Sequence, residues 1–380
     1  MRKQLKTKEI IQIFGCYIII MYLCIINLIC IETNNMIQLS IIIPVYNVEK
    51  YIRTCIESIF RQGLNEDDFE VIIVNDGSKD RSVEVIQDLI KLHENTIIMN
   101  QENQGSSVAR NNGIAAAKGE YILMPDPDDL LIENSLKPLL QKALETKVDL
   151  VVADYLEMRN DDIVSLKTHP IQRSINIPSI EKTGEKLFLE DMNPHQSYIW
   201  RILFRKDFLK QQHIVFIPGI FVQDKPFIYE SYIKAQKCLR ISWPIYIYRK
   251  HSESVSYSMS EKYAKDYCFV ISKLWEFTSL PLLSTKQKQR MIDYTFKTVL
   301  TLMRRLVHEM KDKCKGAEII VYLTQVAPHL KFQQSLKQRI HLYLLKKVPH
   351  TYFNVFYIYI TIYEDKIYPF IKHHFTRYLS

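Results

Sequence analysis

The chain has few glycines for its 380 residues, nine in all, and its seven cysteines are scattered without metal-site spacing. Five of the glycines fall between residues 60 and 120: Gly63, Gly77, Gly105, Gly113 and Gly119. Tight turns, or backbone that approaches a ligand closely, are therefore expected mainly in the first half. Cysteines without a pairing pattern indicate a reducing compartment, so we expect a cytoplasmic protein.

Neither sign of charge dominates the composition. Lysine and arginine number 50 against 42 aspartates and glutamates, which gives a net charge of +8 and a pI of about 8.9. This moderate basic excess suits an anionic ligand or an anionic membrane surface. No nucleic-acid partner is expected. The hydrophobic content of 47% is ordinary for a globular protein.

The chain has one long apolar run, residues 10–31, which follows several basic residues. At about 1.5 Å per residue it would span roughly 33 Å, close to the bilayer core of about 30 Å. The basic flank would leave the N-terminus in the cytosol, and an anchor of this orientation would place the rest of the chain outside it. Alternatively, translation starts at Met36, directly before the first expected strand. Residues 1–35 are thus either an anchor or an untranslated extension.

Residues 38–155 alternate between apolar runs and amphipathic segments. We expect strands at 39–45, 69–74, 96–99, 121–124 and 148–155, and helices at 49–62, 80–92, 106–118 and 135–145. This alternation predicts an α/β fold with a mostly parallel sheet covered on both faces. Right-handed crossovers then bring the carboxyl ends of the strands to one edge.

Residues 124–129, Met-Pro-Asp-Pro-Asp-Asp, follow one of these strands and hold Asp126, Asp128 and Asp129. The two prolines disfavour continuation of the strand, so a stiff turn is expected. Carboxylates this close repel one another unless a cation or several donors offset the charge. A hard divalent ion, Mn²⁺ or Mg²⁺, is the predicted occupant. The alternative is a solvated acidic turn in which Asp129 caps a helix that starts near residue 132.

Further polar groups follow the other strands at the same predicted edge. Tyr46 and Asn47 come after the first strand and Asp76 after the second, and a helix with Arg110 in its second turn starts at Ser106. A helix N-terminus with an arginine suits a diphosphate. For Arg110 the alternative is a surface salt bridge.

Four segments, in this order and spacing, resemble the family 2 glycosyltransferases. They are 41–47 (Ile-Ile-Ile-Pro-Val-Tyr-Asn), 74–78 (Val-Asn-Asp-Gly-Ser), 109–111 (Ala-Arg-Asn) and 126–129 (Asp-Pro-Asp-Asp). The match is dense over residues 38–130 and weaker beyond. The resemblance implies the glycosyltransferase A fold, a Rossmann-like sheet that binds a nucleotide-sugar together with a divalent metal.

The resemblance also implies roles for individual residues. Asp76 would accept a hydrogen bond from a uracil ring, and Pro44 and Tyr46 would line the base. Arg110 would lie near the nucleotide. Asp128 would bind the metal directly, and Asp126 would contact the ribose or the water shell of the ion.

In the second half, Gln223-Asp224 stands where the family commonly has Glu-Asp. The resemblance implies that Asp224 is the general base for the acceptor hydroxyl. The alternative is that Asp224 only caps a helix at 225–235. The segment from 246 to 256 also matches, and His251 is either a metal ligand or a structural histidine.

Residues 36–258 are predicted to form the catalytic domain and residues 259–380 a helical region. From residue 330 onward eight basic side chains stand against Glu364 and Asp365, interleaved with aromatic residues. A cationic, aromatic, helical segment is typical of docking on an anionic membrane face. The alternative is a helical subdomain that packs on the catalytic core.

The resulting prediction is an inverting hexosyl- or N-acetylhexosaminyl-transferase at the inner face of the cell membrane. It would move a single sugar from a nucleotide-sugar, UDP-linked by the resemblance, to a glycan or lipid-linked acceptor in surface polysaccharide synthesis. The Gln-x-x-Arg-Trp signature of processive members is absent. One alternative is a catalytically silent, membrane-associated glycan-binding scaffold of the same fold, which Gln223 favours. Another is a sugar nucleotidyltransferase, for which residues 44–48 lack the glycine- and arginine-rich loop.

Overall fold

The computed structural model describes residues 37–159, 178–193, 196–251, 259–310, 312–332 and 335–362, together with the isolated residues 21 and 163. Apart from Met21, the apolar run at 10–31 lies outside this part of the chain, as do Met36 and the tail beyond residue 362. The predictions made on those residues stay predictions. Within the described residues no helix is long and apolar enough to cross a bilayer.

Nine strands of the described residues form one sheet, and its first half is parallel. The order is β3-β2-β1-β4-β8-β6-β9-β5, with β7 paired to β9. The parallel strands are β1 (Leu39–Val45), β2 (Phe69–Asn75), β3 (Thr96–Asn100) and β4 (Tyr121–Leu123). The predicted α/β class is confirmed, and each of these strands lies within one residue of its predicted bounds.

The second half of the sheet is mixed in direction. It contains β5 (Leu130–Leu131), β6 (Leu150–Arg159), β7 (Ser179–Lys182), β8 (Ile202–Arg205) and β9 (Cys238–Lys250). β8 runs antiparallel to β4 and β6, and β9 runs parallel to β6 but antiparallel to β5 and β7. The pairing of β5 with β9 brings the turn of aspartates beside the end of β9.

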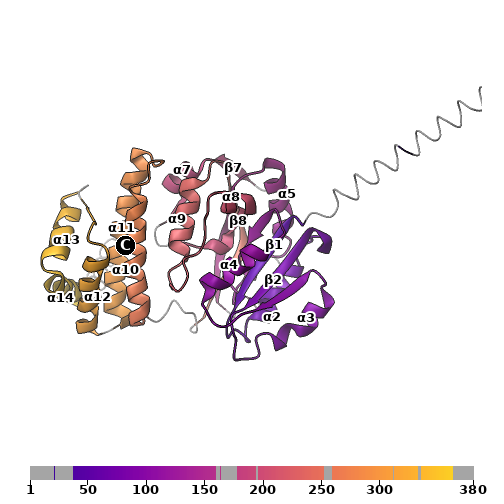
Figure 1. Cartoon of the computed structure of the whole chain (residues 1–380), viewed down its shortest axis with the longest axis horizontal. Helices are drawn as coiled ribbons and strands as arrows, with labels where there is room; N and C mark the ends of the chain where they lie inside the picture. Colours follow the sequence, from indigo (N-terminus) through magenta and orange to yellow (C-terminus); the bar gives the residue numbers. More distant parts are fainter. Residues whose placement is uncertain are drawn as a thin grey trace, which may run out of the picture.

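Helices cover both faces of the sheet (Figure 1). They include α2 (Ile52–Phe60), α3 (Gln87–Leu92), α4 (Ser106–Ala116), α5 (Leu136–Thr146), α7 (Gly184–Lys186), α8 (Lys206–Gln211) and α9 (Asp224–Lys234). Along β1, Ile42 belongs to the core on one face, whereas Ile41 and Ile43 belong to the core on the other. A strand buried on both faces has a continuous apolar sequence, which is why this strand was predictable. Gly113 lets α4 lie against β1, because a Cβ there would be 2.2 Å from a methyl carbon of Ile42.

The helix predicted at 80–92 is wrong in its first half. A 3₁₀ turn at Glu84–Ile86 leads into α3, which begins only at Gln87. Before it, polar side chains bond the loop that follows β1: Ser82 Oγ accepts from the amide of Val48 at 2.7 Å, and Asp80 Oδ2 accepts from that of Glu49 at 3.0 Å. Such side-chain bonds to backbone compete with helix formation.

The C-terminal helices form two layers at one end of the molecule (Figure 1). They are α10 (Glu261–Phe277), α11 (Thr285–Arg305), α12 (Lys313–Val326), α13 (Leu336–Lys347) and α14 (Pro349–Tyr359). Leu274 of α10 and Met291 of α11 join the core on one face of the sheet. Other side chains of α10 and α11 pack with α12–α14 in a separate core. The helical region therefore packs through α10 and α11 on α9 and on the π-helical turn Leu187–Asp191, which lie between it and the sheet, and α12–α14 lie farther out.

Candidate functional site

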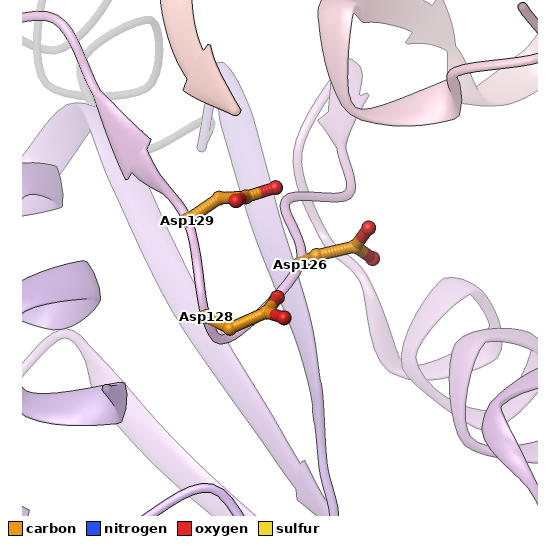
Figure 2. A group of neighbouring side chains, drawn as sticks. All are labelled: Asp126, Asp128 and Asp129. Atoms are coloured by element: carbon orange, nitrogen blue, oxygen red, sulfur yellow. The ribbon is translucent and has the colours of Figure 1, made fainter. Parts of the chain in front are cut away.

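Asp126, Asp128 and Asp129 lie on the turn between β4 and β5. Figure 2 shows their side chains leaving the turn toward the same side. One carboxylate oxygen from each lies within 4.8 Å of those of the other two. Oxygen ligands at this spacing suit a hard divalent cation.

Asp129 is the buried member of the three, only 1% exposed. Its Oδ2 accepts from Tyr246 Oη at 2.9 Å, and its Oδ1 accepts from the amide of Arg249 at 2.7 Å. Burial, together with the charges of Asp128 and Asp126, raises the pKa of Asp129 to about 9. The interpretation of Asp129 as a helix cap is wrong, because it precedes β5 and α5 starts only at Leu136. Asp129 instead fixes the turn to β9.

Tyr246 holds this turn from both sides. Its hydroxyl donates to Asp129 and accepts the amide hydrogen of Asp126 at 2.9 Å. Its ring stacks on Trp200, with centroids 4.1 Å apart and planes 11° from parallel. Sequence reasoning missed Tyr246; the available signal was its place in the segment that also contains His251.

Replacing Tyr246 with phenylalanine is expected to lower the free energy of unfolding by about 1–3 kcal/mol. The ring still fits, but the buried carboxylate of Asp129 loses a donor and the amide of Asp126 loses its acceptor. Denaturant unfolding followed by circular dichroism measures the change. Tyr343→Phe removes a hydroxyl from a residue that is 64% exposed and is the matched control. Equal stability of the two variants would show that Tyr246 does not hold the turn.

His251, from the end of β9, meets the turn at Asp128. Its Nε2 lies 3.0 Å from Asp128 Oδ2, and its ring contacts Tyr51 with centroids 4.4 Å apart. The side chain is 7% exposed, and Nδ1 has no hydrogen-bond partner among the described residues. An imidazole nitrogen beside carboxylate oxygens is a donor set that fits Mn²⁺.

Arg110, from α4, joins two predicted functional carboxylates. Its Nη2 lies 2.6 Å from Asp126 Oδ1 and its Nη1 3.7 Å from Asp224 Oδ1. The guanidinium is buried, because Arg110 is only 4% exposed, whereas the side chains of Asp126 and Asp224 are 28% and 32% exposed. Burial raises the pKa of Asp126 to about 7; Arg110 opposes this rise, and Asp128 and Asp224 add to it.

Asp224 is the first residue of α9, and no side chain caps this helix. Its Oδ1 has no hydrogen-bond partner among the described residues. Burial raises the pKa of Asp224, against the opposing charge of Arg110. The neighbouring Gln223 is buried and donates from Nε2 to Ser106 Oγ, which ties α9 to the start of α4. Asp224 therefore does not act as the cap.

Asp76 is buried at the end of β2 and shapes the loop that leads into α4. Its carboxylate accepts three hydrogen bonds of 2.8 Å, from Gln101 Nε2 and from the amides of Gln104 and Gly105. Gly105 has φ +87°, a conformation that favours glycine. These bonds set the position at which α4 begins and hence the position of Arg110.

Pro44 and Tyr46 differ in exposure. Pro44 is buried inside β1, opposite Val74, and not in a loop. A proline is tolerated there because β4 pairs with β1 only as far as Ile41. Tyr46 directly follows β1 and is 43% exposed.

The fold and the site together define a class of protein. Carboxylates, an arginine and a histidine gather where strands of an open α/β sheet end, the edge at which such sheets bind ligands. Clustered carboxylates beside a helix start and an arginine suit a nucleoside diphosphate and a divalent ion.

Comparisons with known proteins agree with this class. The family described as Glycosyl transferase family 2 matches residues 40–210. The glycosyltransferase EpsJ of Bacillus subtilis (strain 168) is 32% identical over 226 residues, 57% of this chain and 62% of EpsJ. Poly(ribitol-phosphate) beta-glucosyltransferase of Bacillus spizizenii is 28% identical over 203 residues, 53% of this chain and 30% of that protein. The chain thus spans less than two thirds of the length of either relative.

Among solved structures, S. aureus TarS 1–349 in complex with UDP-GlcNAc superposes with a TM-score of 0.66 at 17% identity. The match covers 85% of this chain and 91% of TarS 1–349. It extends the likeness of fold through the C-terminal helices. Residues 40–210 of this chain thus match glycosyltransferase family 2, and the glycosyltransferase relatives and the TarS fold agree with that match.

Proposed function

We propose that the chain is an inverting glycosyltransferase that moves one hexosyl or N-acetylhexosaminyl unit from a UDP-linked donor. The acceptor is a glycan or lipid-linked glycan of a cell-surface polysaccharide. The observation that carries this proposal is the position of Arg110, whose guanidinium reaches both Asp126 and Asp224. One buried cation thereby fixes the spacing between the turn of aspartates and the proposed base.

Asp126, Asp128 and His251 would hold a Mn²⁺ or Mg²⁺ ion, since Asp126 and Asp128 offer carboxylate oxygens within 4.8 Å of each other and His251 Nε2 lies 3.0 Å from Asp128 Oδ2. When bound, the ion offsets the negative charge that develops on the departing diphosphate. Asp128 and His251 would supply direct ligands. Asp126, paired with Arg110, would contact the ribose or the water shell of the ion.

Asp224 is assigned the removal of the proton from the acceptor hydroxyl. As the acceptor oxygen bonds to the anomeric carbon, its proton passes to Asp224 and the nucleoside diphosphate leaves with the electron pair of the broken bond. A base on the face opposite the leaving group gives inversion. The raised pKa of Asp224 makes it a stronger base than an ordinary aspartate.

Asp76, Pro44 and Tyr46 are assigned to the uracil base, and Arg110 to the nucleotide. Asp76 already accepts three hydrogen bonds, and a carboxylate has about four acceptor sites, so one remains for a ring N–H. The complex of TarS with UDP-GlcNAc supports a UDP donor. The similarity to the poly(ribitol-phosphate) beta-glucosyltransferase of Bacillus spizizenii supports an acceptor that is a cell-surface polymer.

Release of nucleoside diphosphate from a panel of UDP-, GDP- and dTDP-sugars, with Mn²⁺ and with water as the acceptor, tests the proposal. We expect release from a UDP-sugar and from no GDP- or dTDP-sugar. Chelation of the metal is expected to stop the release. If the folded protein hydrolyses none of the nucleotide-sugars but still binds UDP, it is a catalytically silent scaffold and not an enzyme. Release from a GDP-sugar alone would overturn the donor assignment.

A further inference from the structure

The outer face of α13 carries a stripe of exposed apolar side chains. Leu336, Ile340 and Tyr343 are 65%, 49% and 64% exposed. Their spacing of four and then three residues places them on one side of the helix. Gln338 and Leu345, on the other side, are buried. Helices normally bury such an apolar face, but α13 exposes it to solvent.

α14 and the turn after it repeat the pattern. Val355, Ile358, Tyr359 and Ile362 are each about half exposed or more, from 47% to 61%. They also follow helical spacing, whereas Tyr352 and Phe353 are buried. The two helices α13 and α14 lie at the end of the molecule that is farthest from the sheet (Figure 1). Isolated exposed apolar residues are common, but six on two adjacent helices, with Ile362 just after them, are typical of an interaction surface.

The charged side chains in the sequence around these two apolar stripes are all basic. From Ile319 to Tyr363 the sequence contains no aspartate or glutamate. The same stretch contains five basic residues, all exposed: Lys331, Lys337, Arg339, Lys346 and Lys347. Four of them lie on α13, where they flank or extend the apolar stripe. The apolar stripe of α13 is therefore bordered by basic side chains.

We propose that α13 and α14 dock on the surface of an anionic lipid bilayer. The apolar stripes would enter the boundary between headgroups and acyl chains, where tyrosines are favoured, while the lysine and arginine heads remain at the phosphates. Each cation near an anionic leaflet adds to the attraction. A second copy of the chain fits less well, because it would bring the same uncompensated cations against these. Docking concerns the helical end of the chain and does not depend on the proposed catalytic activity.

The experiment uses the full chain with vesicles of phosphatidylcholine, with and without phosphatidylglycerol. Sedimentation measures binding, and hydrogen exchange resolved by peptide shows where the chain is protected. Slower exchange across residues 336–362 is expected with the anionic vesicles alone, and it should be lost at high salt. Hydrogen exchange separates this surface from residues 10–31, which could bind vesicles by themselves.

A triple variant reverses the charge of three basic residues of α13: Lys337→Glu, Arg339→Glu and Lys347→Glu. It is expected to abolish the slower exchange at residues 336–362 and to weaken binding to the anionic vesicles at least ~100-fold. The matched control reverses three exposed lysines of the sheet domain, Lys91, Lys142 and Lys210, and should keep the protection. Ile340→Ser with Tyr343→Ser tests the apolar stripe and should also weaken binding.

Vesicle binding without protection at 336–362 would overturn the proposal. So would protection that the zwitterionic vesicles produce equally, or protection that survives the charge reversal. A dimer in analytical centrifugation that the Ile340→Ser, Tyr343→Ser variant abolishes would assign the surface to a second copy instead.

Discussion

Asp224→Asn is expected to lower turnover by roughly 10²–10⁴-fold, the usual contribution of a general base. Donor binding should survive, because the isosteric amide keeps the shape of the residue beside Arg110. Asp224 Oδ1 accepts no hydrogen bond from the described residues, and the pKa of Asp224 is raised by burial; both features fit a group that accepts a proton. UDP release and UDP affinity, measured on the same preparation, separate loss of chemistry from loss of binding.

The pH dependence of wild-type turnover and stability provides a second test of the role of Asp224. A raised pKa means that the base form of Asp224 appears at a higher pH than for an ordinary aspartate, so turnover should rise with pH through that pKa. The same shift means that ionised Asp224 opposes folding, so stability falls as pH rises. Asp224→Asn should therefore lose this rising limb without being less stable at alkaline pH.

Two other carboxylates serve as controls for this assignment. Asp191 lies 2.5 Å from Lys182, and Glu230 lies 2.6 Å from Lys234, so both are held in ion pairs. Asp191→Asn and Glu230→Gln are expected to keep turnover within a few-fold of wild type. Near-normal transfer by Asp224→Asn, with loss in either of the other two variants, would move the base to that residue.

Asp128→Ala is expected to remove metal-dependent UDP binding and to lower turnover at least ~100-fold. The reason is that a bound ion stabilises the negative charge that develops in the transition state by several kcal/mol. The fold should remain, because the Asp128 side chain is 26% exposed and Asp129, not Asp128, anchors the turn. Titration of Mn²⁺ in the presence of UDP, followed by electron paramagnetic resonance, measures the loss.

Asp67→Ala is the matched control, because Asp67 is an exposed aspartate on the 3₁₀ turn Glu66–Asp68. It should bind Mn²⁺ and UDP as the wild type does. His251→Ala is expected to weaken Mn²⁺ binding as well, by removing the nitrogen ligand. Full activity of Asp128→Ala would refute the metal assignment.

The sequence predicted the first four strands closely because β1 and β2 are buried on both faces and read as unbroken apolar runs. β8 and β9 were not predicted, because neither has a long continuous apolar sequence. β8 has only four residues, and β9 mixes buried residues with the exposed or half-buried Arg240, Trp243 and Pro244. Short or mixed strands show no clear period, so their pairing is set by the rest of the fold.

The candidate site was predicted where local motifs carry it and missed where distant segments meet. Asp126 and Asp128 stand in one motif, and the structure brings Arg110 and His251 to them. The roles of Asp129 and Tyr246 in fixing the turn arise from the pairing of β5 with β9, more than 110 residues apart in sequence. No local pattern encodes such a contact.

Thermal unfolding of the full chain with UDP, in the presence and absence of Mn²⁺, tests whether the chain holds a metal-dependent nucleotide-sugar site. UDP at about 100 times its dissociation constant should stabilise the protein by roughly 2.7 kcal/mol. This shift is expected with UDP and Mn²⁺ together, a much smaller shift without the metal, and none with ADP or GDP. A folded protein that no nucleoside diphosphate stabilises would contradict the assignment of Asp76, Asp126 and Asp128 to a nucleotide-sugar site.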